Sequence, residues 1–220
     1  MTSRKTDPQK TRTRTHAEGP ATRETAGRLP AAVQETVSRN QEKILDTALR
    51  LFTRYGVDAT PTSRISREAG VSTGTLFHYF PDKNSLVAQL YISIKRDFAE
   101  AIRSSDDETL SMKQRLEQCL RRYIEWGVAN PEKVQFLDQF DNYPGVRDVV
   151  MHQAYDDFVW ILDLFDAAVR EGILPDLPRE FQMVMLSRVL NGILALIESG
   201  SSGMSQDEII ENGLAMLWKH

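Results

Sequence analysis

Residues 60–86 read TPTSRISREAGVSTGTLFHYFPDKNSL, and this stretch carries the signals of two short helices joined by a tight turn. Thr60-Pro61 is a good helix start, because threonine caps free amides and proline suits the first helical position. Gly70-Val71-Ser72 interrupts that helix, and Ser72 can cap a second helix that runs to Phe80. Two short helices around a glycine-containing turn are typical of a helix-turn-helix, whose second helix enters the DNA major groove.

The second of these helices has an apolar side and an unusual outward side. At 100° per residue, Leu76 and Phe80 share one face and are expected to be buried. The opposite and flanking positions combine a small residue, a hydroxyl, an imidazole and aromatic rings, namely Gly74, Thr75, Phe77, His78 and Tyr79. Such groups can donate to phosphates, touch base edges or contact a thymine methyl. The alternative is a short helix that only covers a core.

An amphipathic helix precedes this pair. Ser38 and Gln41 have capping-box spacing, and apolar residues then recur on one helical face until Gly56. We therefore expect a three-helix DNA-binding domain over residues 38–84, with the helix-turn-helix motif at about 62–81.

Charge is distributed unevenly along the chain, although the net charge is −4. Residues 1–84 carry 14 lysines and arginines against 9 acids, whereas residues 85–220 carry 13 against 22. A basic front end is expected where only one part of a chain approaches phosphates. Residues 1–37 hold almost no large apolar side chains and are predicted to be a disordered basic arm, which is either a solvated tail or a DNA contact.

The remainder of the chain is predicted to be helical. Helical patterns are expected at about 111–129, 131–141, 146–171, 179–199 and 205–219, after a helix that follows Asn84. No stretch alternates convincingly with a period of two, so no sheet is expected. The fold class is therefore all-α, with about nine helices divided between the helix-turn-helix domain and a C-terminal domain over residues 85–220.

Several classes of protein are excluded by what the sequence lacks. Cys119 is the only cysteine, so no internal disulfide can form, and no Cys/His cluster has the spacing of a metal site. There is no nucleophile motif, phosphate-binding glycine loop or acid/base pair, so an enzyme is not expected, nor is a cofactor. No run approaches the roughly 20 apolar residues of a membrane span, which favours a cytoplasmic protein with no membrane partner.

The stretch from Asn40 to Leu86 resembles the N-terminal domain of the TetR family of bacterial transcriptional regulators. The most specific piece is AGVSTGTLFHYF at residues 69–80, followed by Lys83 and Leu86. The rest of the chain resembles the family in layout. The resemblance implies a homodimer that binds double-stranded operator DNA and responds to a small-molecule effector, most often as a repressor.

By this resemblance, the residues that face DNA lie at the start of the first helix of the pair, on the second helix and just after it: Thr62, Ser63, Thr73, Gly74, Thr75, Phe77, His78, Tyr79 and Lys83. Thr73, Gly74 and Thr75 are the candidates for base edges. Thr62, Tyr79 and Lys83 are better placed for phosphates, which set register without reading sequence. Lys83 is alternatively an ordinary solvated lysine.

Four positions depart from the usual family pattern. Ser66 stands where alanine is common and Thr73 where lysine is frequent, while Phe77 replaces the usual tyrosine and Tyr79 a frequent histidine. The operator sequence therefore does not transfer from relatives.

A dimer surface is expected because one recognition helix touches too few base pairs, and helix-turn-helix proteins usually pair to read two half-sites. Apolar stripes near the C-terminus suit the four-helix bundle that the resemblance implies: Met183, Leu186, Leu190, Ile193, Ile197, Ile210, Leu214 and Leu217. Gly192 and Gly213 would let helices approach closely. The alternative is that both stripes serve the core of one subunit.

The helices between them supply apolar side chains for a ligand pocket, and a fairly apolar ligand is preferred. The candidates are Tyr123, Trp126, Phe136, Phe140, Tyr155, Phe158, Leu162 and Phe165. We interpret the chain as a regulator that a ligand releases from a palindromic operator. The alternative is a DNA-binding regulator whose C-terminal domain is a protein-interaction or purely structural dimerisation module.

Overall fold

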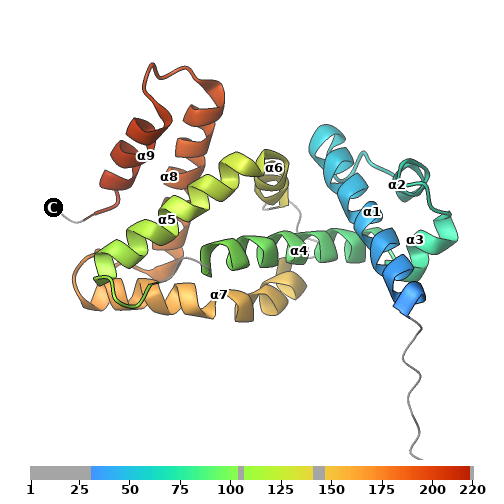
Figure 1. The fold of residues 1–220 in the computed structure, drawn as a ribbon, viewed down its shortest axis with the longest axis horizontal. Helices are drawn as coiled ribbons and strands as arrows, with labels where there is room; N and C mark the ends of the chain where they lie inside the picture. The colour runs from blue at the N-terminus through green and yellow to red at the C-terminus, as the bar shows by residue number, and fades with distance from the viewer. Residues whose placement is uncertain (1–30, 104–106, 141–146, 219–220) are drawn as a thin grey trace, which may run out of the picture.

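A computed structural model describes residues 31–103, 107–140 and 147–218 of the chain, and it describes side chains for residues 38–103, 107–140 and 159–218. Within these residues the fold is nine helices and no strand, which confirms the all-α prediction. Three helices form the N-terminal unit: α1 (Ala31–Tyr55), α2 (Thr62–Glu68) and α3 (Thr73–Tyr79). A longer helix, α4 (Lys83–Arg103), leads from this unit into the second part of the molecule (Figure 1).

The N-terminal unit closes around a small apolar core. Phe52 of α1, Ile65 of α2 and Leu76 of α3 are fully buried, as is Phe80 directly after α3. Gly70 between α2 and α3 has a φ of 69°, a left-handed conformation that glycine adopts without strain. The tight turn therefore follows from the sequence at that position.

The first helix begins earlier than the capping signal predicted. It starts at Ala31, so Ser38 lies within the helix, where its hydroxyl donates to the Glu42 carboxylate at 2.9 Å. The residues from Ala31 onward continue a helix without any glycine or proline to stop it, and a serine inside such a run is not a start signal. The rest of the predicted arm, residues 1–30, lies outside the described residues.

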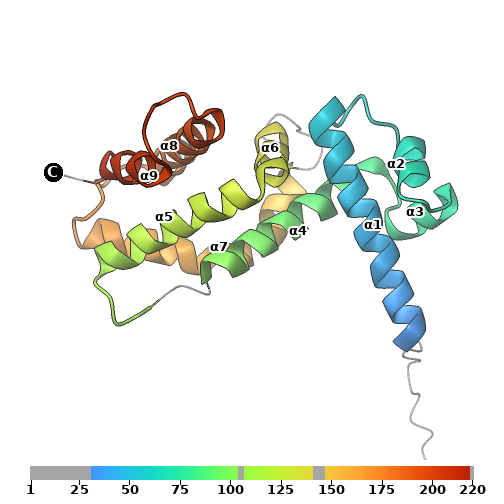
Figure 2. The ribbon, with the colours of Figure 1, turned by 45° about the horizontal axis from the view of Figure 1, so that its top comes forward.

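The second part of the molecule contains five further helices: α5 (Met112–Ala129), α6 (Pro131–Phe140), α7 (Arg147–Arg170), α8 (Arg179–Ser199) and α9 (Gln206–Ala215). Helices α4, α5 and α7 lie along one another, and α8 and α9 form a hairpin over α5, on the side away from α1–α3 (Figures 1 and 2). Ser111 and Ser205 cap α5 and α9 with capping boxes.

The contact between α5 and α8 is close at Gly127. A β-carbon at that position would lie 2.7 Å from Cδ1 of Leu194, so the missing side chain lets the two helices pack together. Gly213 of α9 meets Ile193 of α8 in the same way. The predicted role of Gly213 in close helix approach is therefore realised inside one subunit.

Helix α6 ties the second part of the molecule to α1. The rings of Phe52 and Phe136 are stacked with centroids 6.2 Å apart, and Phe136 is fully buried. The side-chain amides of Gln135 and Gln139 both donate to the carbonyl of Thr53, at 3.4 and 3.3 Å. Because of these contacts, a movement of α6 would also displace α1.

Helix α8 is the most apolar element. Among the described residues it is the one helix that is long and apolar enough to cross a membrane by length and composition, and 17% of the tested stretch is buried in the chain. The sequence-based statement that no run approaches this length was therefore wrong, because a span tolerates the few charged and polar residues that interrupt α8. Much of this apolar surface is left uncovered by the single chain.

Candidate DNA-binding interface and ligand cavities

Helix α3 is held at both ends and presents its remaining side to solvent. The Ser72 hydroxyl accepts from the Thr75 amide at 2.9 Å, which caps the helix as predicted. Leu76 and Phe80 anchor α3 in the core, also as predicted. Opposite them, an exposed set consists of Thr73, Gly74, Phe77 and His78, with Thr75 and Tyr79 half-buried at its edges. The side chains proposed to meet DNA therefore share the open side of α3.

The start of α2 differs in one detail from the sequence expectation. The Thr60 hydroxyl does not cap α2 but turns back to the end of α1, where it donates to the Gly56 carbonyl at 2.8 Å. Pro61 occupies the capping position without a side-chain hydrogen bond. A fully buried hydroxyl needs a partner, and the carbonyls at the end of α1 are the nearest ones. Thr62 and Ser63 are half-buried and exposed, respectively.

Lys83 is more constrained than a freely solvated lysine. Its Nζ donates to the Asp58 carbonyl at 3.2 Å, in the loop between α1 and α2. Partial burial lowers the pKa of Lys83, and the nearby Asp58 carboxylate opposes this shift. The side chain therefore links the start of α4 to the loop between α1 and α2.

A charged cluster beside α2 was missed by the sequence analysis. The guanidinium of Arg64 lies 4.1 Å from the centroid of the Tyr55 ring, and Glu68 accepts from Arg64 at 2.8 Å and from Arg50 at 2.9 Å. Hydrogen bonds from Arg64, and then from Arg50, lower the pKa of Glu68. The cluster joins the outer faces of α1 and α2. The four-residue spacing of Arg64 and Glu68 was a visible signal for part of it.

An apolar cavity lies between α4, α5, α7 and α8. It has a volume of about 210 Å³, and an adjoining cavity of about 190 Å³ shares Leu120, Phe165 and Leu186 with it. The larger of the two is lined from α4 by Lys95, Phe98 and Ile102. Tyr123 and Phe165, both predicted pocket residues, line this cavity.

The other predicted pocket residues lie elsewhere. Trp126 packs on Phe98, with ring centroids 5.2 Å apart, while Phe136 and Phe140 belong to the junction of α6 with α1 and α4. Leu162 is half-buried and lines neither cavity. The side chains of Tyr155 and Phe158 are outside the described residues. The aromatic residues of these helices belong to the helical core. Which residues line the cavity depends instead on how the helices pack against one another.

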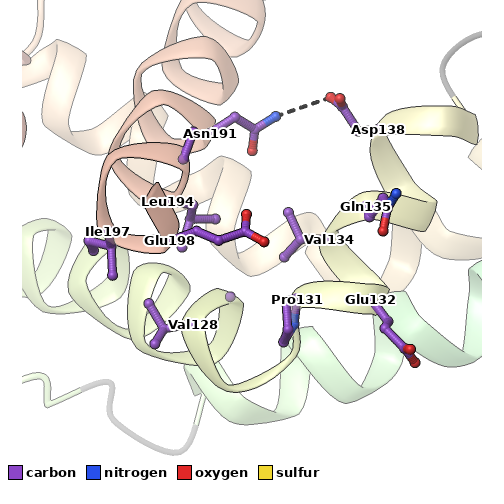
Figure 3. Close-up of a pocket in the computed structure, with 12 residues that line it drawn as sticks. Val128, Pro131, Glu132, Val134, Gln135, Asp138, Asn191, Leu194, Ile197 and Glu198 are labelled. Carbon is purple, nitrogen blue, oxygen red and sulfur yellow. Dashed lines mark hydrogen bonds between the residues drawn. The ribbon is translucent and has the colours of Figure 1, made fainter. Parts of the chain in front are cut away.

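Apart from these two cavities, a more polar groove runs between α6 and α8, with a volume of about 640 Å³ (Figure 3). Glu198 points across it toward Val134, and the Asn191 amide donates to Asp138 at 3.4 Å. The Tyr123 hydroxyl in turn donates to Asn191 Oδ1 at 3.3 Å. Burial, and secondarily the charge of Asp138, raises the pKa of Tyr123 to about 12. Tyr123 thus lies between the groove and the apolar cavity.

The predicted dimer stripe faces inward. Leu190, Ile193, Ile210 and Leu214 are at most 4% exposed, and they are covered by helices of their own subunit. Met183, Leu186, Ile197 and Leu217 are partly buried against the same core. Four of the eight side chains are therefore covered within one subunit, whereas Met183, Leu186, Ile197 and Leu217 keep part of their surface open. Apolar residues recur at helical spacing on more than one side of α8. Only the packing of α5 and α9 decides which of these sides is buried.

A different apolar stripe of α8 is open to solvent. Phe181, Val184, Met185 and Leu196 are each between 42% and 52% exposed. Arg188 and Gly192 lie on the same side, and a β-carbon at Gly192 would meet nothing within 4 Å. We refer to Phe181, Val184, Met185, Arg188, Gly192 and Leu196 as the outer stripe of α8.

Comparison with known proteins gives consistent matches. Residues 44–90 match the family described as bacterial regulatory proteins, tetR family. A transcriptional regulator of the helix-turn-helix type from Haemophilus influenzae is 24% identical over 145 residues, which are 66% of this chain and 75% of the relative.

Solved structures extend the similarity to both parts of the molecule. A tetR family transcription regulator from Shewanella sp. PV-4 is 31% identical, with a TM-score of 0.75 over 82% of this chain and 99% of its own. The transcriptional regulator FadR from Bacillus subtilis, solved in complex with stearoyl-CoA, has a TM-score of 0.63 over 80% of this chain and 96% of its own. At 17% identity, that second likeness concerns the fold.

Proposed function

Because this chain belongs to the TetR family and is a DNA-binding transcriptional regulator, we propose that it is a homodimeric repressor that a small, fairly apolar ligand releases from a palindromic operator. The observation that carries this proposal is that α4 connects the two sites. Its first turns follow α3 directly, and its later residues Phe98 and Ile102 line the apolar cavity. We place the boundary between the DNA-binding and ligand-binding domains near the start of α4, at about residue 84, and we expect the protein to act in the cytoplasm.

DNA recognition is assigned to the open side of α3. Thr73, Gly74 and Thr75 lie at its first turn and are assigned to base edges, because the first residues of a recognition helix reach the groove. Thr62, Tyr79 and Lys83 are assigned to phosphates, with Ser63, Phe77 and His78 beside them. Lys83 keeps its hydrogen bond to the Asp58 carbonyl in this arrangement, so the loop between α1 and α2 fixes the position of its ammonium group.

Dimerisation is assigned to the outer stripe of α8, in place of the inward stripe that the sequence suggested. Exposed apolar patches of this kind mark interaction sites in soluble proteins. Gly192 at the centre of the stripe offers room for a partner helix to approach. A dimer through α8 also accounts for the low burial of this apolar helix in the single chain.

Ligand release follows if the ligand binds one arrangement of the heads better than the other. A ligand in the apolar cavity would press on Phe98 and Ile102 and shift α4 relative to α1. The FadR protein of Bacillus subtilis was solved with stearoyl-CoA, and an apolar cavity lining supports a related preference for apolar chains here.

The experiment is a binding assay with the purified full-length protein. DNA upstream of its own gene and a selected random library should both give a specific, salt-sensitive complex, since phosphate contacts release counterions. Adding apolar ligands that raise the melting temperature should weaken that complex. Specific DNA binding with no ligand response would support the purely structural or protein-interaction alternative for the C-terminal domain, and absence of specific binding would contradict the proposal.

A further inference from the structure

Two positions at which the chain departs from the family pattern contact each other. The hydroxyl oxygens of Ser66 in α2 and Thr73 in α3 lie 3.2 Å apart. Ser66 is 2% exposed, whereas Thr73 is exposed at the start of the recognition helix. A buried hydroxyl under the helix-turn-helix is thus joined to a hydroxyl that faces outward.

The direction of this hydrogen bond follows from the second contact of Ser66. Its hydroxyl also lies 3.2 Å from the Ser63 carbonyl oxygen, which can only accept. A serine hydroxyl has a single proton. Both bonds are therefore made only when Ser66 donates to Ser63 and Thr73 donates to Ser66. Buried polar groups are nearly always hydrogen-bonded, and this arrangement gives the Ser66 hydroxyl one donated and one accepted hydrogen bond.

This hydrogen bond limits how the Thr73 hydroxyl can bind to DNA. Its proton is used within the protein, so its oxygen has only lone pairs left for an outside partner. In the major groove, adenine and cytosine present amino donors, whereas guanine and thymine present acceptor oxygens at the corresponding positions. An acceptor-only hydroxyl discriminates between these two groups of bases.

We propose that Ser66 is a positioning residue that makes Thr73 accept hydrogen bonds only, so that Thr73 selects adenine or cytosine over guanine or thymine at the base that it faces. This inference rests on the proposed function, in which α3 enters the major groove. It adds to that function a specificity determinant that never touches DNA itself.

The test measures base preference with the full-length protein and its Ser66→Ala, Thr73→Val and doubly substituted variants. Binding sequences are first selected from a random library with the unaltered protein, and relative affinities for every single-base change are then measured for all four. The base facing Thr73 is the one whose preference Thr73→Val alters. Thr75→Val is the matched control, because its hydroxyl lies on the same helix but contacts Ser72.

At that base, the unaltered protein should favour adenine or cytosine. Ser66→Ala should reduce this preference by about threefold to tenfold, the range of one hydrogen bond, because the freed Thr73 hydroxyl can then also donate to guanine or thymine. Adding Ser66→Ala to Thr73→Val should not change the base preferences further. Ser66→Ala should also leave unchanged the preference at the base whose recognition Thr75→Val alters.

Three results would overturn the inference. They are a preference for guanine or thymine at the Thr73 base, an unchanged preference in Ser66→Ala, or a Thr73→Val variant that reads every base as before. A melting curve for each variant separates a loss of fold from a change in reading. Failure to select any specific sequence with the unaltered protein would instead contradict the proposed function, so the two failures are distinguishable.

Discussion

Replacing Met185 by arginine should separate the proposed dimer. The apolar side chains of the outer stripe, Phe181, Val184, Met185 and Leu196, are each about half exposed in the single chain. Burying a whole side chain of this kind contributes ~1.5–3 kcal/mol, so covering the exposed half contributes about 1 kcal/mol each. Four side chains from each of two subunits then contribute about 8 kcal/mol, before the entropic cost of association.

Met185→Arg acts on this surface twice, once in each subunit. It removes about 2 kcal/mol of apolar burial and places two further positive charges in the contact, where Arg188 already supplies the same sign. An uncompensated buried charge costs several kcal/mol. The dissociation constant of the dimer should therefore rise at least about 100-fold, which corresponds to about 2.7 kcal/mol.

Sedimentation velocity over a range of protein concentrations measures this constant directly. Val128→Arg is the control, because Val128 is 38% exposed but lies on α5 and outside the outer stripe. Met185→Arg should sediment as a folded monomer and lose specific DNA binding, while Val128→Arg should remain a dimer. An unchanged dimer in Met185→Arg would refute the assignment of the interface to this side of α8.

Further predictions concern individual side chains. Tyr79→Phe removes one hydroxyl assigned to a phosphate, so affinity should fall by about threefold to tenfold with the base preferences unchanged, as competition binding with single-base operator variants would reveal. Phe136→Ala empties a fully buried site between α6 and α1, and urea denaturation should show a loss of about 3–5 kcal/mol in unfolding free energy, whereas a loss below about 1 kcal/mol would mean that this junction is not packed as described. Burial raises the pKa of Tyr123 from 10 to about 12, so between these two pH values the unfolded chain loses this proton first and the unfolding free energy should fall as pH rises. Tyr123→Phe should flatten that part of the profile, and equal slopes for both proteins would contradict the assigned burial.

Helix boundaries were predicted well where capping residues and glycine punctuate the chain. Ser72 caps α3 as the sequence predicted, and α5 and α9 begin directly after Ser111 and Ser205, close to the starts of the predicted segments 111–129 and 205–219. Helix α8 was predicted over residues 179–199 and spans Arg179–Ser199. These signals are local, because a cap involves only the first turn of its own helix. They fail at Ser38, where a favourable helical run continues through the serine.

The sequence could not tell which face of an apolar helix is covered. Helix α8 carries apolar side chains on nearly every side, so Leu190 and Met185 were equally suited to a partner helix. The packing of α5 and α9 buries Leu190 and leaves Met185 half exposed. Pocket residues were missed for the same reason, since Phe98 and Ile102 lie on the helix that follows Asn84, which was not assigned to the pocket, and yet they line the apolar cavity. Contacts between helices that are distant in sequence decide both questions.

The hydroxyl network of the recognition helix was likewise invisible to pattern analysis. Ser66 and Thr73 were each noted as departures from the family pattern, seven residues apart. Only the crossing of α2 and α3 brings their oxygens within hydrogen-bond distance. Two departures that lie separately in the sequence are therefore in direct contact in the fold.

In the proposed complex, the open side of α3 enters the major groove of operator DNA in two copies held at a fixed separation. Protection of guanine N7 from dimethyl sulfate on a selected operator tests it directly, because that atom lies in the major groove. We expect two symmetrically placed protected segments, separated by one or more helical turns of about 10 base pairs, and their loss in Met185→Arg. A single protected segment, or protection that persists unchanged in the Met185→Arg monomer, would contradict it.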